Sequence, residues 1–255
     1  MNLYFEETLG EGYKSKTQKI RVMSENWIGK NMFCPCCGNS HICELKNNEP
    51  VADMKCENCG AIFELKSKKG KIGKKINDGA YSTMIERITS ITNPELLLVQ
   101  YSSNYIVTDV ILVPKFFFVP QIIEKRKPLA PTARRAGWTG CNILYSKIPQ
   151  QGKISIIENG IIKSASEVVE NYALIKRLET INIHSRSWLF DVLNCVNDIA
   201  SNEFCLQEIY AYKEILQEKH INNHNIEAKI RQQLQFLRDK GFIEFLGRGH
   251  YKKLF

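Results

Sequence analysis

Two acidic residues and a lysine in the first third of the chain have the types and spacing of a site that hydrolyses phosphodiesters. Ten residues separate Asp53 from Glu64, and Lys66 follows Glu64 by two positions. If residues 63–66 form a strand, Glu64 and Lys66 share one face, because successive side chains of a strand alternate. A turn at residues 56–59 would set Asp53 across from Glu64. The sequence therefore predicts two carboxylates and one ammonium group close together.

Paired carboxylates of this kind bind a hard, oxygen-seeking cation such as Mg²⁺. The cation polarises a phosphoryl group and helps to form hydroxide from water, while a nearby lysine offsets the charge that develops on the phosphorus oxygens. The spacing Asp-x10-Glu-x-Lys resembles the signature of PD-(D/E)xK nucleases. The alternative interpretation is that Glu64 and Lys66 belong to a solvated strand face.

Four cysteines around the same stretch form two Cys-x-x-Cys pairs. Eighteen residues separate the pair Cys34 and Cys37 from the pair Cys56 and Cys59. This spacing is typical of a tetrahedral Cys₄ zinc site, which is closed to solvent and therefore structural. Because the second pair lies between the two carboxylates, zinc would hold the turn that aligns them.

The other cysteines leave some alternatives open. Cys36, His41 or Cys43 could replace one of the four zinc ligands, and a redox Cys-x-x-Cys pair is a further alternative. The total of nine cysteines is odd, and the chain has no export signal, which argues against a disulfide framework. We expect the remaining three cysteines to be packed thiols: Cys141, Cys195 and Cys205.

Size and composition describe a soluble globular protein with a basic surface. The 255 residues are 44% hydrophobic and 24% charged, which suits one large domain or two smaller ones. The net charge of +8 favours a polyanionic partner. No apolar run is long enough to span a membrane, and the N-terminus lacks the features of an export signal. We expect a cytoplasmic protein without a membrane partner.

The elements expected around the site are those of an α/β domain over residues 1–182. An amphipathic helix is predicted at 13–27, and a second helix over 78–91 with its N-cap near Asn77 or Asp78. Strands are predicted at 96–101 and 106–113, and their apolar density indicates a sheet buried on both faces. Residues 115–120 and 154–157 should continue or border this sheet.

Two basic stretches of this domain are candidates for DNA contact. Residues 66–75 hold six lysines, among them Lys68 and Lys69, and are either a phosphate-binding segment or a solvated loop. Residues 128–143 indicate a shaped loop in which Arg134 and Arg135 could bind phosphates or guanine edges. Trp138 is either a core anchor or a flat apolar face for a base or a methyl group.

The composition changes near residue 183, and residues 183–255 predict a winged-helix domain. Helices are expected at 186–201, 206–219 and 225–240, followed by strands at 242–246 and 250–255 around a Gly-Arg-Gly turn. One side of the third helix carries a core stripe: Ile226, Ile230, Gln233, Leu234 and Leu237. The opposite side carries side chains suited to base edges in the major groove: Asn225, Lys229, Gln232 and Gln235.

Charge is distributed unevenly along this second domain. From residue 229 to the end there are seven Lys or Arg against two acids, whereas residues 184–228 hold three against seven. The basic charge therefore belongs to the third helix and the wing, where Arg231 and Arg248 are candidate DNA contacts. A winged helix that binds another protein is the alternative.

Taken in order, these segments resemble the DpnI family of methyl-directed restriction endonucleases over nearly the whole chain. The zinc knuckles carry the resemblance together with residues 50–53, 63–69, 77–81, 128–142 and 229–235. The resemblance implies a PD-(D/E)xK nuclease core with an inserted zinc site, followed by a winged helix. It also implies a bacterial type II restriction endonuclease that cleaves double-stranded DNA at GATC containing N6-methyladenine.

The resemblance further assigns roles by position. Asp53 and Glu64 would bind catalytic Mg²⁺ together with the Leu65 carbonyl, and Lys66 would lie beside the attacking water. Structural Zn²⁺ would be held by Cys34, Cys37, Cys56 and Cys59. Both domains would read DNA sequence, and we expect the protein to be a monomer.

Two other functions compete with this hypothesis. A transcription regulator built from a zinc ribbon and a winged helix would explain the cysteines and the C-terminal domain without catalysis, but it leaves the spacing of Asp53, Glu64 and Lys66 as coincidence. A related nuclease for damaged or differently modified DNA would keep the chemistry and change the substrate.

Overall fold

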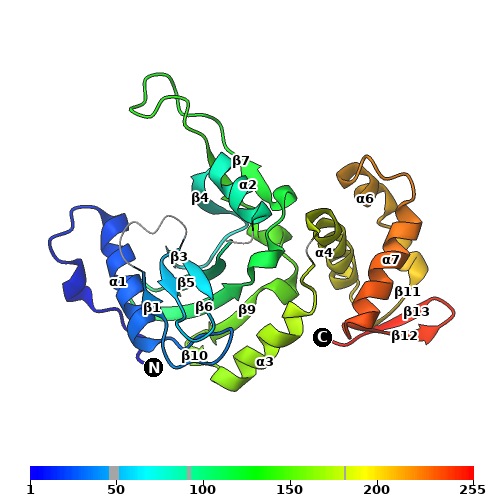
Figure 1. Cartoon of the computed structure of the whole chain (residues 1–255), viewed down its shortest axis with the longest axis horizontal. Helices are drawn as coiled ribbons and strands as arrows, with labels where there is room; N and C mark the ends of the chain where they lie inside the picture. Colours follow the sequence, from blue (N-terminus) through cyan, green and yellow to red (C-terminus); the bar gives the residue numbers. More distant parts are fainter. Residues whose placement is uncertain (46–51, 91–92, 181) are drawn as a thin grey trace. The chain divides into compact units, whose positions relative to one another are not determined.

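The computed structural model describes residues 1–45, 52–90, 93–180 and 182–255, and the chain forms two compact units (Figure 1). The first unit comprises Met1–Ser146 and Gln151–Lys176, and the second comprises Lys147–Gln150 and Arg177–Phe255. Pro50 and Val51, which belong to the segments that carry the family resemblance, lie outside the described residues, as does Ile91 at the end of the second predicted helix.

A seven-stranded sheet in the order β1-β2-β3-β5-β6-β9-β10 forms the centre of the first unit. Its strands are β1 Cys43–Glu44, β2 Met54–Lys55, β3 Ile62–Lys69, β5 Glu95–Tyr101, β6 Val107–Val113, β9 Ile154–Glu158 and β10 Ile161–Ile162. Strands β3 and β5 run parallel, whereas the other neighbours are antiparallel. Every residue of β5 is buried, so the prediction of burial on both faces is confirmed for this strand. Strand β6 is half-buried at Thr108, Asp109 and Ile111, so the prediction holds only in part there.

Helices cover this sheet (Figure 1). Helix α1 (Lys16–Asn31) packs against β1 and β3, and α3 (Ala165–Lys176) packs against β9. Helix α1 begins later than predicted. It also ends later, because Ile28 continues its buried face. Residues 115–120, which were expected to continue or border the sheet, do not continue it as a strand: they follow β6 as short 3-10 helices, η2 (Lys115–Phe117) and η3 (Pro120–Ile122). Further 3-10 turns lie at Glu7–Gly10, Tyr145–Lys147 and Gln150–Gly152.

A smaller sheet in the order β4-β8-β7 also belongs to the first unit, and α2 (Tyr81–Thr89) packs against it. Its strands are β4 Ile76–Ala80, β8 Gly140–Ile143 and β7 Ile123–Lys125. The predicted helix start near Asn77 or Asp78 is therefore wrong. Residues 76–80 pair with β8 through a bulge between Asp78 and Ala80, since Asn, Asp and Gly favour bulges and turns as well as helix caps.

The second unit has the order of a winged helix, as predicted. It comprises α4 Ile183–Asp198, β11 Glu203–Cys205, α5 Leu206–Tyr210, α6 Lys213–Lys219, α7 Ile226–Asp239, β12 Ile243–Gly247 and β13 His250–Lys253. Three details differ from the prediction. The first helix, α4, begins and ends three residues earlier than the predicted range 186–201. The second helix is divided at Ala211 and Tyr212 into α5 and α6, and β11 adds a third strand to the wing, in the order β11-β13-β12.

Among the described residues, no helix is both long enough and apolar enough to cross a membrane.

Candidate functional site

Asp53 and Glu64 are brought together by a hairpin between β2 and β3, as the spacing predicts. Met54 pairs with Phe63 across the two strands, and the Asp53 N–H donates to the Phe63 carbonyl over 2.9 Å. The Leu65 N–H in turn donates to Oδ2 of Asp53 over 2.8 Å. The Asp53 carboxylate is therefore fixed at the level of residue 65, between Glu64 and Lys66 in the chain.

Lys66 lies between two carboxylates. Its Nζ is 2.7 Å from Oε1 of Glu64 and 2.8 Å from Oδ1 of Asp78. Burial would lower the pKa of the Lys66 ammonium, but attraction to Glu64 and Asp78 outweighs burial and raises that pKa above its ordinary value. Lys66 is therefore a cation at neutral pH and can donate hydrogen bonds to a phosphate or a water molecule.

Each of the two predicted metal-binding carboxylates also faces an arginine. Arg87 of α2 lies 3.7 Å from Oε2 of Glu64, and Arg21 of α1 lies 3.7 Å from Oδ1 of Asp53. Arg21 also pairs with the buried Glu25 over 2.6 Å, and burial raises the pKa of that carboxyl group above its ordinary value. The site is thus surrounded by charges of both signs.

The residue motif did not identify Arg21, Asp78 or Arg87 as parts of this site. They come from α1, β4 and α2, and only the tertiary fold places them near β3. A charged residue at each of these positions was visible in the sequence, but no spacing rule connects them with Glu64 or Lys66.

The oxygen donors of this site match the ligand preference of Mg²⁺. Asp53 and Glu64 supply carboxylates and Leu65 supplies a backbone carbonyl, and such hard oxygen ligands are those that Mg²⁺ takes in proteins. Among the described residues, however, the carboxylates of Asp53, Glu64 and Asp78 do not converge in the way that the four thiols do. Lys66 occupies the space between Glu64 and Asp78.

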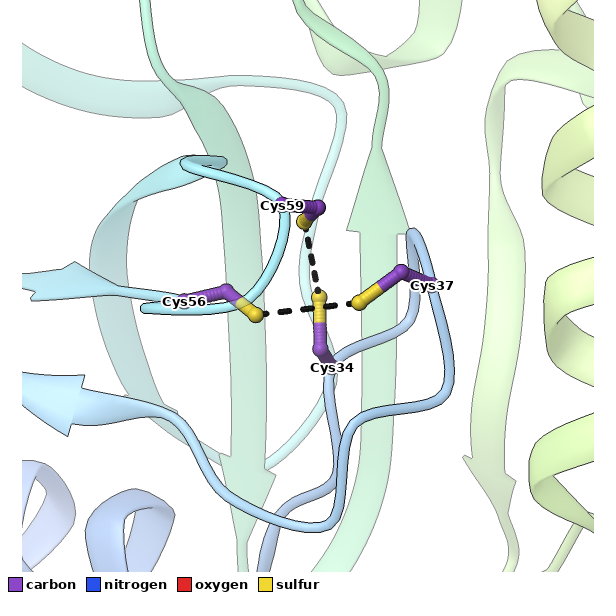
Figure 2. Close-up of side chains that lie close together, drawn as sticks. All are labelled: Cys34, Cys37, Cys56 and Cys59. Atoms are coloured by element: carbon purple, nitrogen blue, oxygen red, sulfur yellow. Dashed lines mark hydrogen bonds between the residues drawn. The ribbon is translucent and has the colours of Figure 1, made fainter.

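The four predicted zinc ligands converge at the turn of the same hairpin (Figure 2). The Sγ atoms of Cys34, Cys37, Cys56 and Cys59 all lie within 4.8 Å of one another. The Sγ atoms of Cys34 and Cys59 are 3.7 Å apart, and so are the Sγ atoms of Cys37 and Cys56. A tetrahedral site with Zn–S bonds of about 2.3 Å would place its sulfurs about 3.8 Å apart. Two of the sulfur–sulfur distances match this value and the rest stay within 4.8 Å, so the four thiols suit a Zn²⁺ ion.

The alternative ligands lie outside this cluster. Cys36 follows Cys34 but is not one of the converging thiols. His41 Nδ1 is 2.7 Å from the hydroxyl of Ser40, and Cys43 is exposed on β1. The geometry selects the four cysteines of the two Cys-x-x-Cys pairs as the set that could hold a metal.

Basic side chains lie next to the site. Lys66 lines a cavity of about 260 Å³ together with Lys68, Lys75 and Asn77. Lys68 and Lys69 are exposed at the end of β3. This concentration of cations at the end of the active strand suits contact with phosphate groups.

The loop predicted at 128–143 ends earlier than expected, because residues 140–143 form β8. The part between β7 and β8 extends away from the small sheet (Figure 1). Arg134 and Arg135 are exposed, whereas Trp138 is half-buried. The guanidinium group of Arg135 lies 4.7 Å from the centre of the Trp138 ring. A Cβ atom at Gly140 would approach within 2.8 Å of that ring, so glycine at the start of β8 makes room for the tryptophan.

Helix α7 has the two faces that its sequence predicts. Its buried residues are Ile226, Ile230, Gln233, Leu234 and Leu237. The side chains predicted to contact DNA are exposed at Gln232 and Gln235 and half-buried at Lys229, whose Nζ is 2.7 Å from Oε1 of Gln232. Arg231 is exposed and donates to the hydroxyl group of Tyr210.

The remaining two predicted DNA contacts stand at the ends of elements. Asn225 is the N-cap residue of α7. Arg248 is exposed in the wing turn and has a φ of 48°, between Gly247 and Gly249, which also have positive φ. The turn therefore presents the Arg248 side chain to solvent.

Two family models match the chain. The DpnI model, described as the Dam-replacing family, matches residues 1–181. The DpnI_C model, described as the Dam-replacing HTH domain, matches residues 184–253. The two matches account for almost the whole sequence and meet where the composition changes.

Proposed function

The chain belongs to the DpnI, or Dam-replacing, family of restriction endonucleases and carries that family's HTH domain, and from this we propose its reaction and substrate. The protein hydrolyses phosphodiester bonds of double-stranded DNA at GATC sites that contain N6-methyladenine, and the reaction requires Mg²⁺. Residues 1–182 carry catalysis, and residues 183–255 form a second DNA-binding domain.

One observation of the site carries the proposal. Asp53 is tied to the backbone of residue 65 over 2.8 Å, and Lys66 is 2.7 Å from Glu64. A pair of carboxylates held to the same short piece of strand, with a protonated lysine beside one of them, suits metal-assisted hydrolysis of a phosphodiester.

Asp53, Glu64 and the carbonyl of Leu65 are the residues that would hold Mg²⁺. When bound there, Mg²⁺ supplies a Lewis acid that polarises the phosphoryl oxygens and makes water more acidic. Lys66 contributes a positive charge that stabilises the charge developing on the phosphate and orients the attacking water. The hairpin holds Asp53 and Glu64 on neighbouring strands, which limits the positions that the two carboxylates can take.

Contacts with the DNA backbone fall to the basic side chains around this site. Lys68 and Lys69 extend from β3 and can bind phosphates, and Arg134 and Arg135 can do so from the long loop.

Trp138 offers an apolar surface to the N6-methyl group. In the winged helix, the side chains that would contact DNA are Asn225, Lys229, Arg231, Gln232, Gln235 and Arg248.

The four cysteines serve folding in this proposal. Zn²⁺ held by the thiols would fix the turn that joins β2 to β3, and with it the register of Asp53 and Glu64. No step of the hydrolysis involves the thiols. We further propose that the protein acts as a monomer.

The test is digestion of one plasmid, prepared with and without adenine methylation at GATC, in Mg²⁺ and in EDTA. Cleavage that is confined to the methylated plasmid in Mg²⁺ is the expected result. Cleavage of neither plasmid, together with tight binding of both, would favour the transcription regulator. Equal cleavage of both plasmids would refute the methyl preference while leaving the nuclease.

A further inference from the structure

A third carboxylate contacts the site from the small sheet. Asp78 lies on β4, and its side chain is only 7% exposed. Its Oδ1 accepts hydrogen bonds from the Lys66 ammonium over 2.8 Å and from the Gly79 N–H over 2.6 Å. Its Oδ2 is buried and accepts no hydrogen bond from the described residues.

We propose that Asp78 is a positioning residue that holds Lys66 in place when Glu64 binds Mg²⁺. The inference rests on the proposed function and adds a residue to it. Asp78 does not touch the DNA or the reacting phosphate in this proposal. It acts through Lys66 alone.

The argument begins with the hydrogen bonds of Lys66. An ammonium group has three N–H donors, and Glu64 and Asp78 account for one acceptor each. The third donor remains for a water molecule or a phosphate oxygen. The direction of this third donor depends on the other two, so both carboxylates determine where Lys66 acts.

Mg²⁺ would change how strongly each of the two carboxylates, Glu64 and Asp78, attracts the Lys66 ammonium group. Glu64 already shares its oxygens between Lys66 at 2.7 Å and Arg87 at 3.7 Å. A dication at Glu64 attracts the same lone pairs and repels the ammonium group of Lys66. Asp78 is then the carboxylate that keeps Lys66 from moving out of the site.

The local structure suits this role. Asp78 stands at the bulge between Asp78 and Ala80, and its side chain reaches Lys66 of β3. Bulges are common beside active sites, where they re-aim side chains. The Gly79 N–H fixes one oxygen of the carboxylate. A buried carboxylate oxygen without a partner lowers the stability of a fold, and such a cost is expected where a residue serves function.

The variant Asp78→Asn tests the proposal, because it keeps the shape of the side chain and an acceptor for Gly79 while removing the charge. The matched control is Glu6→Gln in the same unit. Glu6 also pairs with a lysine, Lys30 of α1, over 2.7 Å, and neither residue belongs to the site or to the proposed DNA contacts. Both variants are made in the full chain.

Four measurements are compared for these proteins. Single-turnover cleavage of methylated DNA by Asp78→Asn should be slower by about 10–100-fold, while DNA binding without metal and the Tm stay near those of the unaltered protein. Amine labelling of Lys66, read by mass spectrometry in Mg²⁺, should be several-fold faster than in the unaltered chain. Glu6→Gln should change none of the four.

The outcomes separate this inference from the proposed function. Unchanged cleavage and unchanged Lys66 labelling in Asp78→Asn would overturn the role of Asp78, provided that the unaltered protein cuts and Lys66→Ala does not. In the Lys66→Ala background, Asp78→Asn should lower the residual rate no further, and a further loss would also overturn it. If Asp78→Asn does not fold, Asp78→Glu is measured instead. This variant keeps the negative charge, so Lys66 should be labelled no faster than in the unaltered chain. Faster labelling of Lys66 in Asp78→Glu would overturn the proposal. Normal cleavage by Lys66→Ala would instead refute the proposed active site.

Discussion

Each acidic side chain at the candidate site has a cationic neighbour. Arg21 faces Asp53, Arg87 faces Glu64, and Lys66 bridges Glu64 and Asp78. This arrangement reduces the repulsion between the carboxylates before a metal binds. It also implies that Mg²⁺ at Asp53 and Glu64 competes with cations that the protein itself supplies, so its affinity should be modest.

Trp138 permits a test of methyl reading by a single side chain. Its ring has Arg135 over one face at 4.7 Å, and it is only half-buried, so it is not a core anchor of the ordinary kind. We expect Trp138→Ala to reduce the ratio of methylated to unmethylated cleavage by about fourfold, since burying one methyl group is favourable by about 0.8 kcal/mol. Single-turnover rates on two matched duplexes give this ratio.

The control for Trp138 is Arg135→Ala. It removes the cation from the ring but leaves the apolar surface, so it should weaken binding to both duplexes alike. A wild-type ratio in Trp138→Ala, with an unchanged Tm, would mean that the tryptophan is structural.

The hairpin of β2 and β3 is the element on which the proposed catalytic residues depend. Cys59 lies in its turn and contributes one of four converging thiols. We expect Cys59→Ser to lose zinc and to lower cleavage at least about tenfold in saturating Mg²⁺, because Asp53 and Glu64 lose their register. Metal analysis and cleavage rates measure these two effects, and the Tm shows whether the variant still folds.

Cys43→Ser is the matched control for the zinc prediction. This cysteine is exposed on the neighbouring strand β1 and lies outside the cluster, so zinc content and cleavage should be unchanged. Full activity of a zinc-free, Mg²⁺-replete protein would show that the metal does not preorganise the hairpin.

Helix α7 makes a prediction about salt dependence. Arg231 is exposed and is oriented by the hydroxyl group of Tyr210, as a phosphate contact would be. Arg231→Ala should weaken DNA binding and reduce the slope of log K against log salt by about 1. Lys213→Ala serves as the control, because Lys213 pairs with Glu227 over 2.8 Å, and it should leave the slope unchanged. An unaltered slope in Arg231→Ala would remove that residue from the interface.

The elements differ in how far the sequence predicts them. The apolar strand β5 and the buried stripe of α7 follow from side-chain periodicity, which is strong in both. Strand β4 was missed because Asn77, Asp78 and Gly79 fit a helix cap as well as a bulge. Its pairing with β8, more than sixty residues away, decides between the two.

The residues of the candidate site also differ in whether local sequence or only the tertiary fold connects them. Asp53, Glu64 and Lys66 lie within one hairpin, so their spacing is sufficient to connect them. Asp78 and Arg87 reach Lys66 and Glu64 only through the packing of the small sheet and α2. Contacts of this kind depend on the fold of the whole unit and have no signature in local sequence.

Over the whole molecule, basic charge is concentrated where DNA contact is proposed in each unit. Residues 66–75 hold six lysines in the first unit, and residues 229–255 hold seven Lys or Arg against two acids in the second. Two methyl groups, one on each strand, are together worth about 1.6 kcal/mol of burial, or about fifteenfold. One contact alone discriminates weakly, so a strongly methyl-dependent enzyme benefits from a reader in each unit.

This argument predicts how selectivity is divided within the intact chain. Four exposed side chains of the second unit are changed to Ala together: Arg231, Gln232, Gln235 and Arg248. We expect weaker DNA binding and a methyl preference that falls by about fourfold but does not vanish, because the catalytic unit keeps its own reader. Single-turnover cleavage of methylated and unmethylated duplexes measures the preference, and Glu214→Ala with Glu218→Ala on α6 controls for changes to an exposed helix. A preference equal to that of the unaltered protein would place all methyl reading in the first unit, and a complete loss would place it in the second.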